Sequence, residues 1–102
     1  MAVDCRLEDE SGKEIDVVRD PTGVLNRLIP AADDGGFQCW RFIDEYGDTV
    51  FNHLQMGQFL NELELLRADA SQPGAEEVLG QLERLARRCQ LEVHLYLKFY
   101  GD

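Results

Sequence analysis

The chain has 102 residues, of which 44% are apolar and 29% charged, and its formal net charge is −10. This length suits one globular domain with its own hydrophobic core, and the composition excludes wholesale disorder. A strongly acidic chain repels nucleic acid and anionic membranes and attracts basic proteins. We therefore expect a basic protein as the partner, and no nucleic acid or membrane. The alternative interpretation is that the acidity serves solubility.

The cysteines and the N-terminal sequence predict a reducing, cytoplasmic location. Cys5, Cys39 and Cys89 are odd in number and far apart, which indicates neither a disulfide framework nor a zinc site. Each lies at an apolar-periodic position, so we expect buried, inert thiols. The first residues show no signal peptide, and no apolar run is long enough to span a bilayer.

The first thirty residues predict a hairpin and a short helix. Apolar and polar residues alternate over 3–7 and 14–17, around the polar turn 9–12, which is typical of paired strands. Asp20 and Pro21 predict the N-cap and first position of a helix that ends at Pro30.

Residues 37–51 predict a second hairpin. The β-rich run 37–43 predicts a central strand, the turn 44–47 follows with Gly47 expected in the left-handed conformation, and 49–51 form the return strand. We expect Trp40 and Phe42 to pack under the helices. The opposing interpretation makes them anchors of an interaction surface.

The second half of the chain predicts two helices and a final strand. Asn52 and Gln55 match a capping box, followed by an apolar helical stripe to about Ala68. A second helix opens at Glu76 and forms an antiparallel hairpin with the first, and residues 91–100 alternate as a strand. The predicted fold is a single α+β domain, 1–102, of order β-β-α-β-β-α-α-β. Its one antiparallel or mixed sheet has about five strands, with helices mainly on one face.

No pattern in the sequence predicts catalysis, a cofactor or a metal. His53 and His94 lack the spacing of metal ligands, and the carboxylate runs 8–10 and 33–34 lack the order of a calcium loop. The main alternative is a small enzyme, or a ligand- or metal-binding domain, that uses His53, His94 and nearby carboxylates.

Two groups of residues predict an interaction surface instead. The first is the turn, with Asp44, Glu45, Tyr46 and Asp48, and the second is the polar face of the last strand, with Tyr96 and Tyr100. Aromatic side chains beside acidic ones suit a protein interface. We therefore expect a non-enzymatic protein-binding domain. A further alternative is a homodimer built on the face or the edge of the last strand.

Two stretches also carry a resemblance. R-F-I-D-E-Y-G-D-T-V-F-N-H-L-Q-M (41–56) and H-L-Y-L-K-F-Y-G-D (94–102) resemble small, mostly uncharacterised bacterial α+β proteins. In size and charge the chain is similar to immunity proteins of polymorphic toxin systems. That resemblance implies an immunity or adaptor role without a catalytic set, and it assigns no binding residue.

Overall fold

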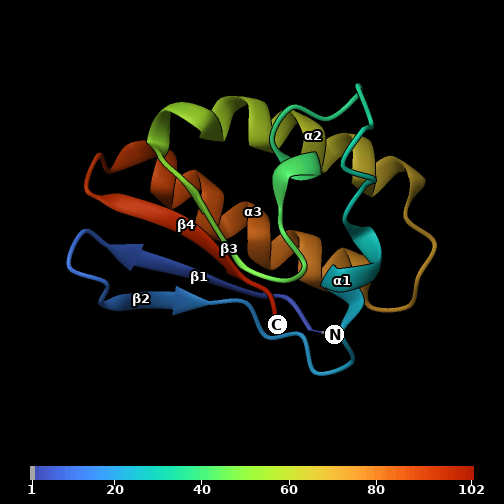
Figure 1. The fold of residues 1–102 in the computed structure, drawn as a ribbon, viewed down its shortest axis with the longest axis horizontal. Helices are drawn as coiled ribbons and strands as arrows, with labels where there is room; N and C mark the ends of the chain where they lie inside the picture. Colours follow the sequence, from blue (N-terminus) through green and yellow to red (C-terminus); the bar gives the residue numbers. More distant parts are fainter. Residues whose placement is uncertain (1) are drawn as a thin grey trace.

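A computed structural model describes residues 2–102 and confirms the α+β class (Figure 1). Two 3-10 helices, η1 and η2, accompany the regular elements. In chain order the elements are β1 (Asp4–Asp9), β2 (Glu14–Val17), α1 (Val24–Leu28), η1 (Trp40–Phe42), β3 (Asp48–Phe51), η2 (His53–Gln55), α2 (Met56–Asp69), α3 (Ala75–Leu91) and β4 (Leu95–Tyr100).

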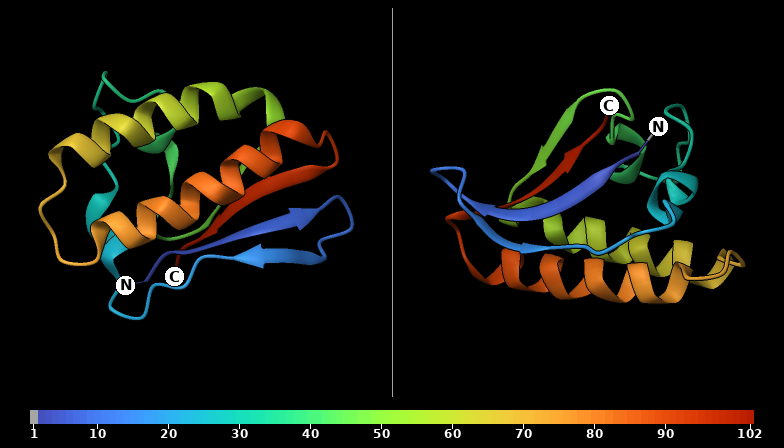
Figure 2. Two further views of the ribbon diagram at one scale, coloured as in Figure 1. Left: turned by 180° about the vertical axis from the view of Figure 1, so that it is seen from behind. Right: turned by 90° about the horizontal axis from the view of Figure 1, so that it is seen from below.

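The sheet has four strands in the order β2-β1-β4-β3, and every neighbouring pair is antiparallel. Its centre is the long pairing of β1 with β4, from Asp4 opposite Tyr100 to Asp9 opposite Leu95. Helices α2 and α3 lie side by side against one face, and no helix of the described residues covers the opposite face (Figure 2). We call this uncovered side the open face.

The predicted strand over residues 37–43 is wrong, so the sheet has four strands and not five. This stretch instead leads into η1 and ends there. The carboxylate of Glu62, on α2, accepts hydrogen bonds from the main-chain amides of Gln38, Cys39 and Trp40 at 2.8 to 3.0 Å. Because these amides point at one buried carboxylate, they are not available to a strand ladder.

The start of α1 also differs from the prediction. Gly23, with φ 69°, holds the N-cap position, and the helix begins at Val24 and not at Pro21. Asp20 still satisfies the helix terminus, because its carboxylate accepts from the amides of Val24 and Leu25, each at 2.8 Å. Asp20 therefore caps the helix as predicted, but it does so from three residues before the N-cap position.

Two local predictions are confirmed. Asn52 and Gln55 form the capping box: Asn52 Oδ1 accepts from the Leu54 amide at 3.0 Å, and Gln55 Oε1 accepts from the Asn52 amide at 2.8 Å. The hairpin of β1 and β2 is also present, with Asp9 Oδ1 accepting from the amides of Ser11 and Lys13 in its turn.

The last strand is shorter than its alternating sequence predicts. α3 continues to Leu91, a turn follows, and β4 starts at Leu95. Inward-facing Leu95, Leu97 and Phe99 are buried as expected, whereas Leu91 and Val93 are exposed. The prediction for residues 91–94 is therefore wrong.

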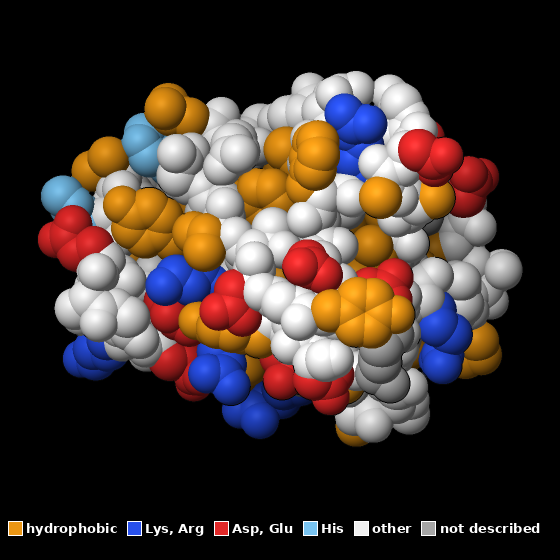
Figure 3. Space-filling model, in the orientation of Figure 1, with side chains coloured by type: hydrophobic (Ala, Val, Ile, Leu, Met, Phe, Trp, Pro, Cys, Tyr) orange, Lys and Arg blue, Asp and Glu red, His pale blue; other side chains and the backbone are white. Residues whose placement is uncertain are grey.

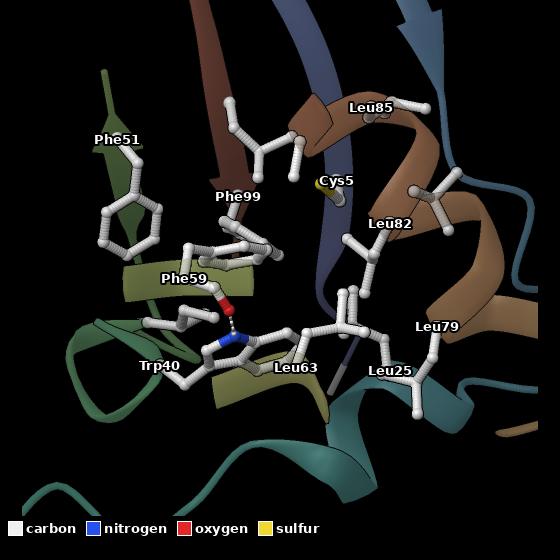
Figure 4. Close-up of a cluster of buried hydrophobic side chains, with 14 of the residues drawn as sticks. Cys5, Leu25, Trp40, Phe51, Phe59, Leu63, Leu79, Leu82, Leu85 and Phe99 are labelled. Carbon is white, nitrogen blue, oxygen red and sulfur yellow. Dashed lines mark hydrogen bonds between the residues drawn. The ribbon is translucent and has the colours of Figure 1, made fainter. Parts of the chain in front are cut away.

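The core lies between the sheet and the two long helices (Figure 4). Trp40 stacks on Phe59 with ring centroids 4.8 Å apart, and its indole N–H donates to the Phe59 carbonyl at 3.2 Å. The prediction that Trp40 fills the core is confirmed. The same prediction for Phe42 is wrong, because its side chain is 58% exposed.

All three cysteines are buried and free, as expected. Burial raises the pKa of each thiol, that of Cys89 to about 11. The thiolate population at neutral pH is therefore low, and the cysteines act as small apolar side chains.

Candidate functional site

The centre of the open face is a polar network between β1 and β4. Glu8 is buried, and its carboxylate accepts from the Tyr100 hydroxyl at 2.5 Å and lies 3.1 Å from Lys98 Nζ. Arg6 lies over the Tyr100 ring, with its guanidinium carbon 5.1 Å from the centroid. These contacts tie the ring and hydroxyl of Tyr100 to the sheet.

The network shifts the pKa of both of its acids. Burial alone would raise the pKa of Glu8, but the hydrogen bonds from Tyr100 and Lys98, together with nearby positive charge, lower it overall. The hydrogen bond to Glu8, reinforced by burial, raises the pKa of Tyr100 to about 12. Both shifts mean that the folded chain favours the pair in which Glu8 is ionised and Tyr100 is protonated.

Tyr96 lies on the same face, near the start of β4. Together with Val50 and Lys98 it lines a shallow hollow of about 240 Å³ that Asp9 and Glu10 border. The two tyrosines predicted as binding residues therefore share one face, but Tyr100 has a fixed structural role and Tyr96 is the more available of the two.

Unpaired carboxylates gather at the end of the open face where β4 finishes. The strand register places Asp4 and Asp48 on either side of Tyr100, and Gly101 N donates to the Gly47 carbonyl at 2.8 Å, which brings Asp102 to the turn. We call this group the acidic end, and it consists of Asp4, Asp44, Glu45, Asp48 and Asp102. Within residues 2–102, none of the five forms an ion pair.

The helical side of the molecule differs, because its carboxylates are largely neutralised. Arg67 contacts Glu64, Glu76 and Glu83 at 2.6 to 3.1 Å, and Arg87 contacts Glu83 at 2.7 Å. The surplus negative charge of the chain is thus concentrated away from α2 and α3.

The turn at the acidic end is held by its own side chains. Asp44 Oδ1 accepts from the Tyr46 amide at 2.8 Å, and the Asp44 amide donates to Thr49 Oγ1 at 2.9 Å. Gly47 is not in the left-handed conformation, contrary to expectation. Asp44 therefore has a structural role as well as a charge, whereas Glu45, Tyr46 and Asp48 remain available.

A groove of about 480 Å³ adjoins the acidic end. It lies between the segment after α1 and the segment from η1 to the turn, and Phe42 and Tyr46, the latter 71% exposed, present aromatic surface beside it. Its lining residues are Ile29, Pro30, Ala31, Ala32, Arg41, Phe42, Ile43, Asp44, Glu45 and Tyr46.

Sequence reasoning gave Arg41 no site role and assigned Phe42 to the core in preference to an interaction surface. The sequence predicts a strand at Arg41 and Phe42, but the structure places the Arg41 guanidinium 4.5 Å above the Phe42 ring, at the groove wall. The signal that could have found them is weak: an Arg-Phe pair just before an acidic turn.

The two histidines lie at the other end of the strands (Figure 3). His94 Nδ1 is 3.1 Å from Glu10 Oε2, and both side chains are exposed. Across residues 2–102, no group of three or more His, Cys, Asp or Glu side chains is arranged to hold a metal ion. The structure thus brings His53 and His94 to the same end without building a ligand set around them from the described residues.

Comparison with known proteins adds no identification. The chain matches no protein-family model, and searches of curated proteins and of solved structures give no match. Within the part of the chain that the structure describes, no helix has both the length and the apolar character needed to cross a membrane.

Proposed function

We propose that this chain is a non-enzymatic protein-binding domain, immunity-like or adaptor-like in its role, that docks a basic protein. The contact surface is the acidic end together with the adjoining groove. The observation that carries the proposal is that the acidic end and the exposed aromatic side chains of the groove are continuous, since the turn at Asp44, Glu45 and Tyr46 belongs to both.

The charge distribution supports a cationic partner. The five carboxylates around this turn, which form no ion pair with any described residue, repel one another, and this repulsion costs folding free energy. Natural proteins keep such local conflicts mainly where function requires them. A basic partner would remove the repulsion on binding, and it would be steered in by the same field.

The groove offers a source of binding energy in addition to electrostatic steering. Interfaces take most of their affinity from a few aromatic or arginine anchors that become buried, surrounded by polar groups. Phe42 and Tyr46 are exposed aromatic side chains beside a concave surface, and Arg41 is already stacked on Phe42. We expect a partner side chain to enter between them while its positive charges meet Glu45 and Asp48.

The test begins by capturing the partner on the immobilised chain and then measures association by stopped flow. Asp4→Asn with Asp48→Asn changes the net charge from −10 to −8 at the acidic end. Asp69→Asn with Glu77→Gln makes the same change on the helical side. Steering predicts that the first pair slows association on the order of tenfold at low salt and the second pair much less.

Stability separates binding from folding in this test. None of these four carboxylates lies in the core, so both double variants should stay folded. Because Asp4→Asn with Asp48→Asn relieves repulsion, that variant should melt at or above the temperature of the parent chain. Equal on-rates for the two double variants would remove the acidic end from the interface, and a captured partner without a basic surface would contradict the proposal itself.

A further inference from the structure

A patch of apolar side chains is exposed at the end of the molecule opposite the acidic end. Leu54 is 79% exposed, Leu91 84% and Val93 54%. They come from η2, from the last residue of α3 and from the turn that follows it, and η2 packs against α3 (Figures 1 and 2). We call these three residues the apolar end.

The apolar end continues onto the open face. Val50, which is exposed, and Tyr96 border the hollow next to it, and Figure 3 shows hydrophobic side chains around both histidines at this end. Single exposed apolar residues are normal on a protein surface, but three at one end of the molecule, from two segments that pack together, indicate an interaction site.

Main-chain hydrogen bonds hold the turn that carries Leu91 and Val93. Leu91 is the last residue of α3, and two main-chain hydrogen bonds close the turn that follows: Glu92 N to the Cys89 carbonyl at 3.3 Å, and Leu95 N to the Glu92 carbonyl at 3.1 Å. Val93 lies within this turn. A preorganised patch loses little further conformational entropy when it is covered.

The charges around the apolar end are of both signs. Arg88 Nε lies 3.1 Å from Glu92, and His94 lies 3.1 Å from Glu10. An arginine and a histidine therefore face two carboxylates at the rim. A two-fold interface brings each patch against itself, so it requires a self-complementary rim of this kind. The acidic end, which carries negative charge alone, would repel its own copy.

From these observations we propose that a second copy of this chain docks on the apolar end, in a two-fold symmetric dimer. Leu54, Leu91 and Val93 of each copy would pack together, and Arg88 and Glu92 could exchange partners across the axis. The contact differs from a dimer through the edge of the last strand, because β4 lies between β1 and β3 and has no free edge along residues 97–100.

The net charge of each copy does not prevent this contact. The two acidic ends would face away from each other, in a molecule whose longest dimension is 34 Å. Charges that far apart are screened at physiological salt, where the Debye length is about 8 Å. The same arrangement leaves both acidic ends free, so the dimer would offer two binding surfaces to basic partners.

The test is the solution mass of the full chain over a wide concentration range, by sedimentation equilibrium. We expect the average mass to rise from 11.6 kDa towards twice that value, and to rise further with added salt, which screens the remaining repulsion. Leu91→Lys with Val93→Lys should keep the chain monomeric. Leu65→Lys, at an exposed leucine (55%) on α2, should behave like the parent chain.

Circular dichroism melting verifies that each variant is folded, and Leu54→Lys provides a second, independent substitution in the patch. A parent chain that stays at the monomer mass at every concentration would overturn the proposal. So would a dimer that survives the substitutions at Leu54, Leu91 and Val93. The salt dependence separates this dimer from the proposed binding of a basic partner at the acidic end. Added salt should weaken the binding of a basic partner, whereas it should strengthen self-association.

Discussion

Glu62 Oε1 accepts a hydrogen bond from the main-chain amide of Trp40 at 3.0 Å, although the two residues are 22 positions apart. The same carboxylate binds the amides of Gln38 and Cys39 and the side-chain amide of Gln58, and Glu62 is fully buried. One side chain of α2 thus fixes the position of η1, and through it the groove wall.

Replacing the Glu62 carboxylate should lower the free energy of unfolding by more than the loss of one ordinary hydrogen bond would. Glu62→Gln keeps the size but turns an N–H₂ group towards donors, so at least one amide loses its acceptor. Hydrogen bonds to a charged group contribute about 1.5–3 kcal/mol each, and we expect a loss of about 3 kcal/mol in urea unfolding. Glu64→Gln, which removes an exposed ion pair on the same helix, should cost less than about 1 kcal/mol. Equal midpoints for the two variants would contradict this role.

Gly101 anchors the end of the chain to the turn through close backbone contact. A Cβ at this position would overlap the carbonyl carbon and oxygen of Glu45, so Gly101→Ala must displace main-chain atoms. We expect a loss of about 1–3 kcal/mol in thermal or urea unfolding.

The matched control, Gly80→Ala, should change the stability of the chain in the opposite direction. Gly80 lies inside α3, and a Cβ added there would meet no atom of the other described elements within 4 Å, so Gly80→Ala should stabilise the chain by about 0.5–1 kcal/mol. If both substitutions shifted stability in the same direction, the close approach of Gly101 to the turn would not be a constraint on the fold.

Local signals explain what the sequence could predict about the fold. Asn52 and Gln55 mark the start of a helix within four residues of sequence. The alternation of apolar and polar residues in β1 and β4 corresponds directly to a buried face of the sheet. The class and the helical hairpin follow from such signals. They fail at residues 37–43, where β-rich composition competes with Glu62, a long-range partner that leaves no local mark.

The candidate site was predictable to a similar degree. The acidic turn and the two tyrosines could be found because their residue types stand out. The structure places both tyrosines on the open face, with Tyr100 at the acidic end and Tyr96 nearer the start of β4. The groove could not be found, because it requires the segment after α1 to lie beside η1. Nor could the restraint on Tyr100, which depends on the register that brings Arg6 and Glu8 next to it.

The lowered pKa of Glu8 predicts a specific pH dependence. A carboxyl group whose pKa is lower in the folded state than its ordinary 4.5 contributes stability above that value, and loses it as the pH falls through the folded pKa. Glu8→Gln removes this contribution and weakens the hydrogen bonds from Tyr100 and Lys98. We expect a loss of about 2 kcal/mol at neutral pH and a flatter acid limb in urea unfolding. Glu14→Gln, which removes an exposed carboxylate 3.7 Å from Arg6, should cost less than about 1 kcal/mol at neutral pH. Parallel curves for the Glu8 variant and the parent chain would exclude this linkage.

Tyr100 predicts the complementary behaviour at alkaline pH. Its pKa is raised from 10.0 to about 12, so the unfolded chain ionises first. The stability that the hydroxyl contributes is complete below pH 10.0 and is lost as the pH rises through about 12. Tyr100→Phe should therefore unfold more easily than the parent chain at neutral pH, by about 1–2 kcal/mol, and the difference should vanish in strong alkali.

Tyr46→Phe, which alters an exposed ring on the turn, should leave the urea midpoint unchanged. In ultraviolet titration, the component with a pKa of about 12 should disappear in the Tyr100 variant; if it persisted, the bond between Tyr100 and Glu8 would not be its cause.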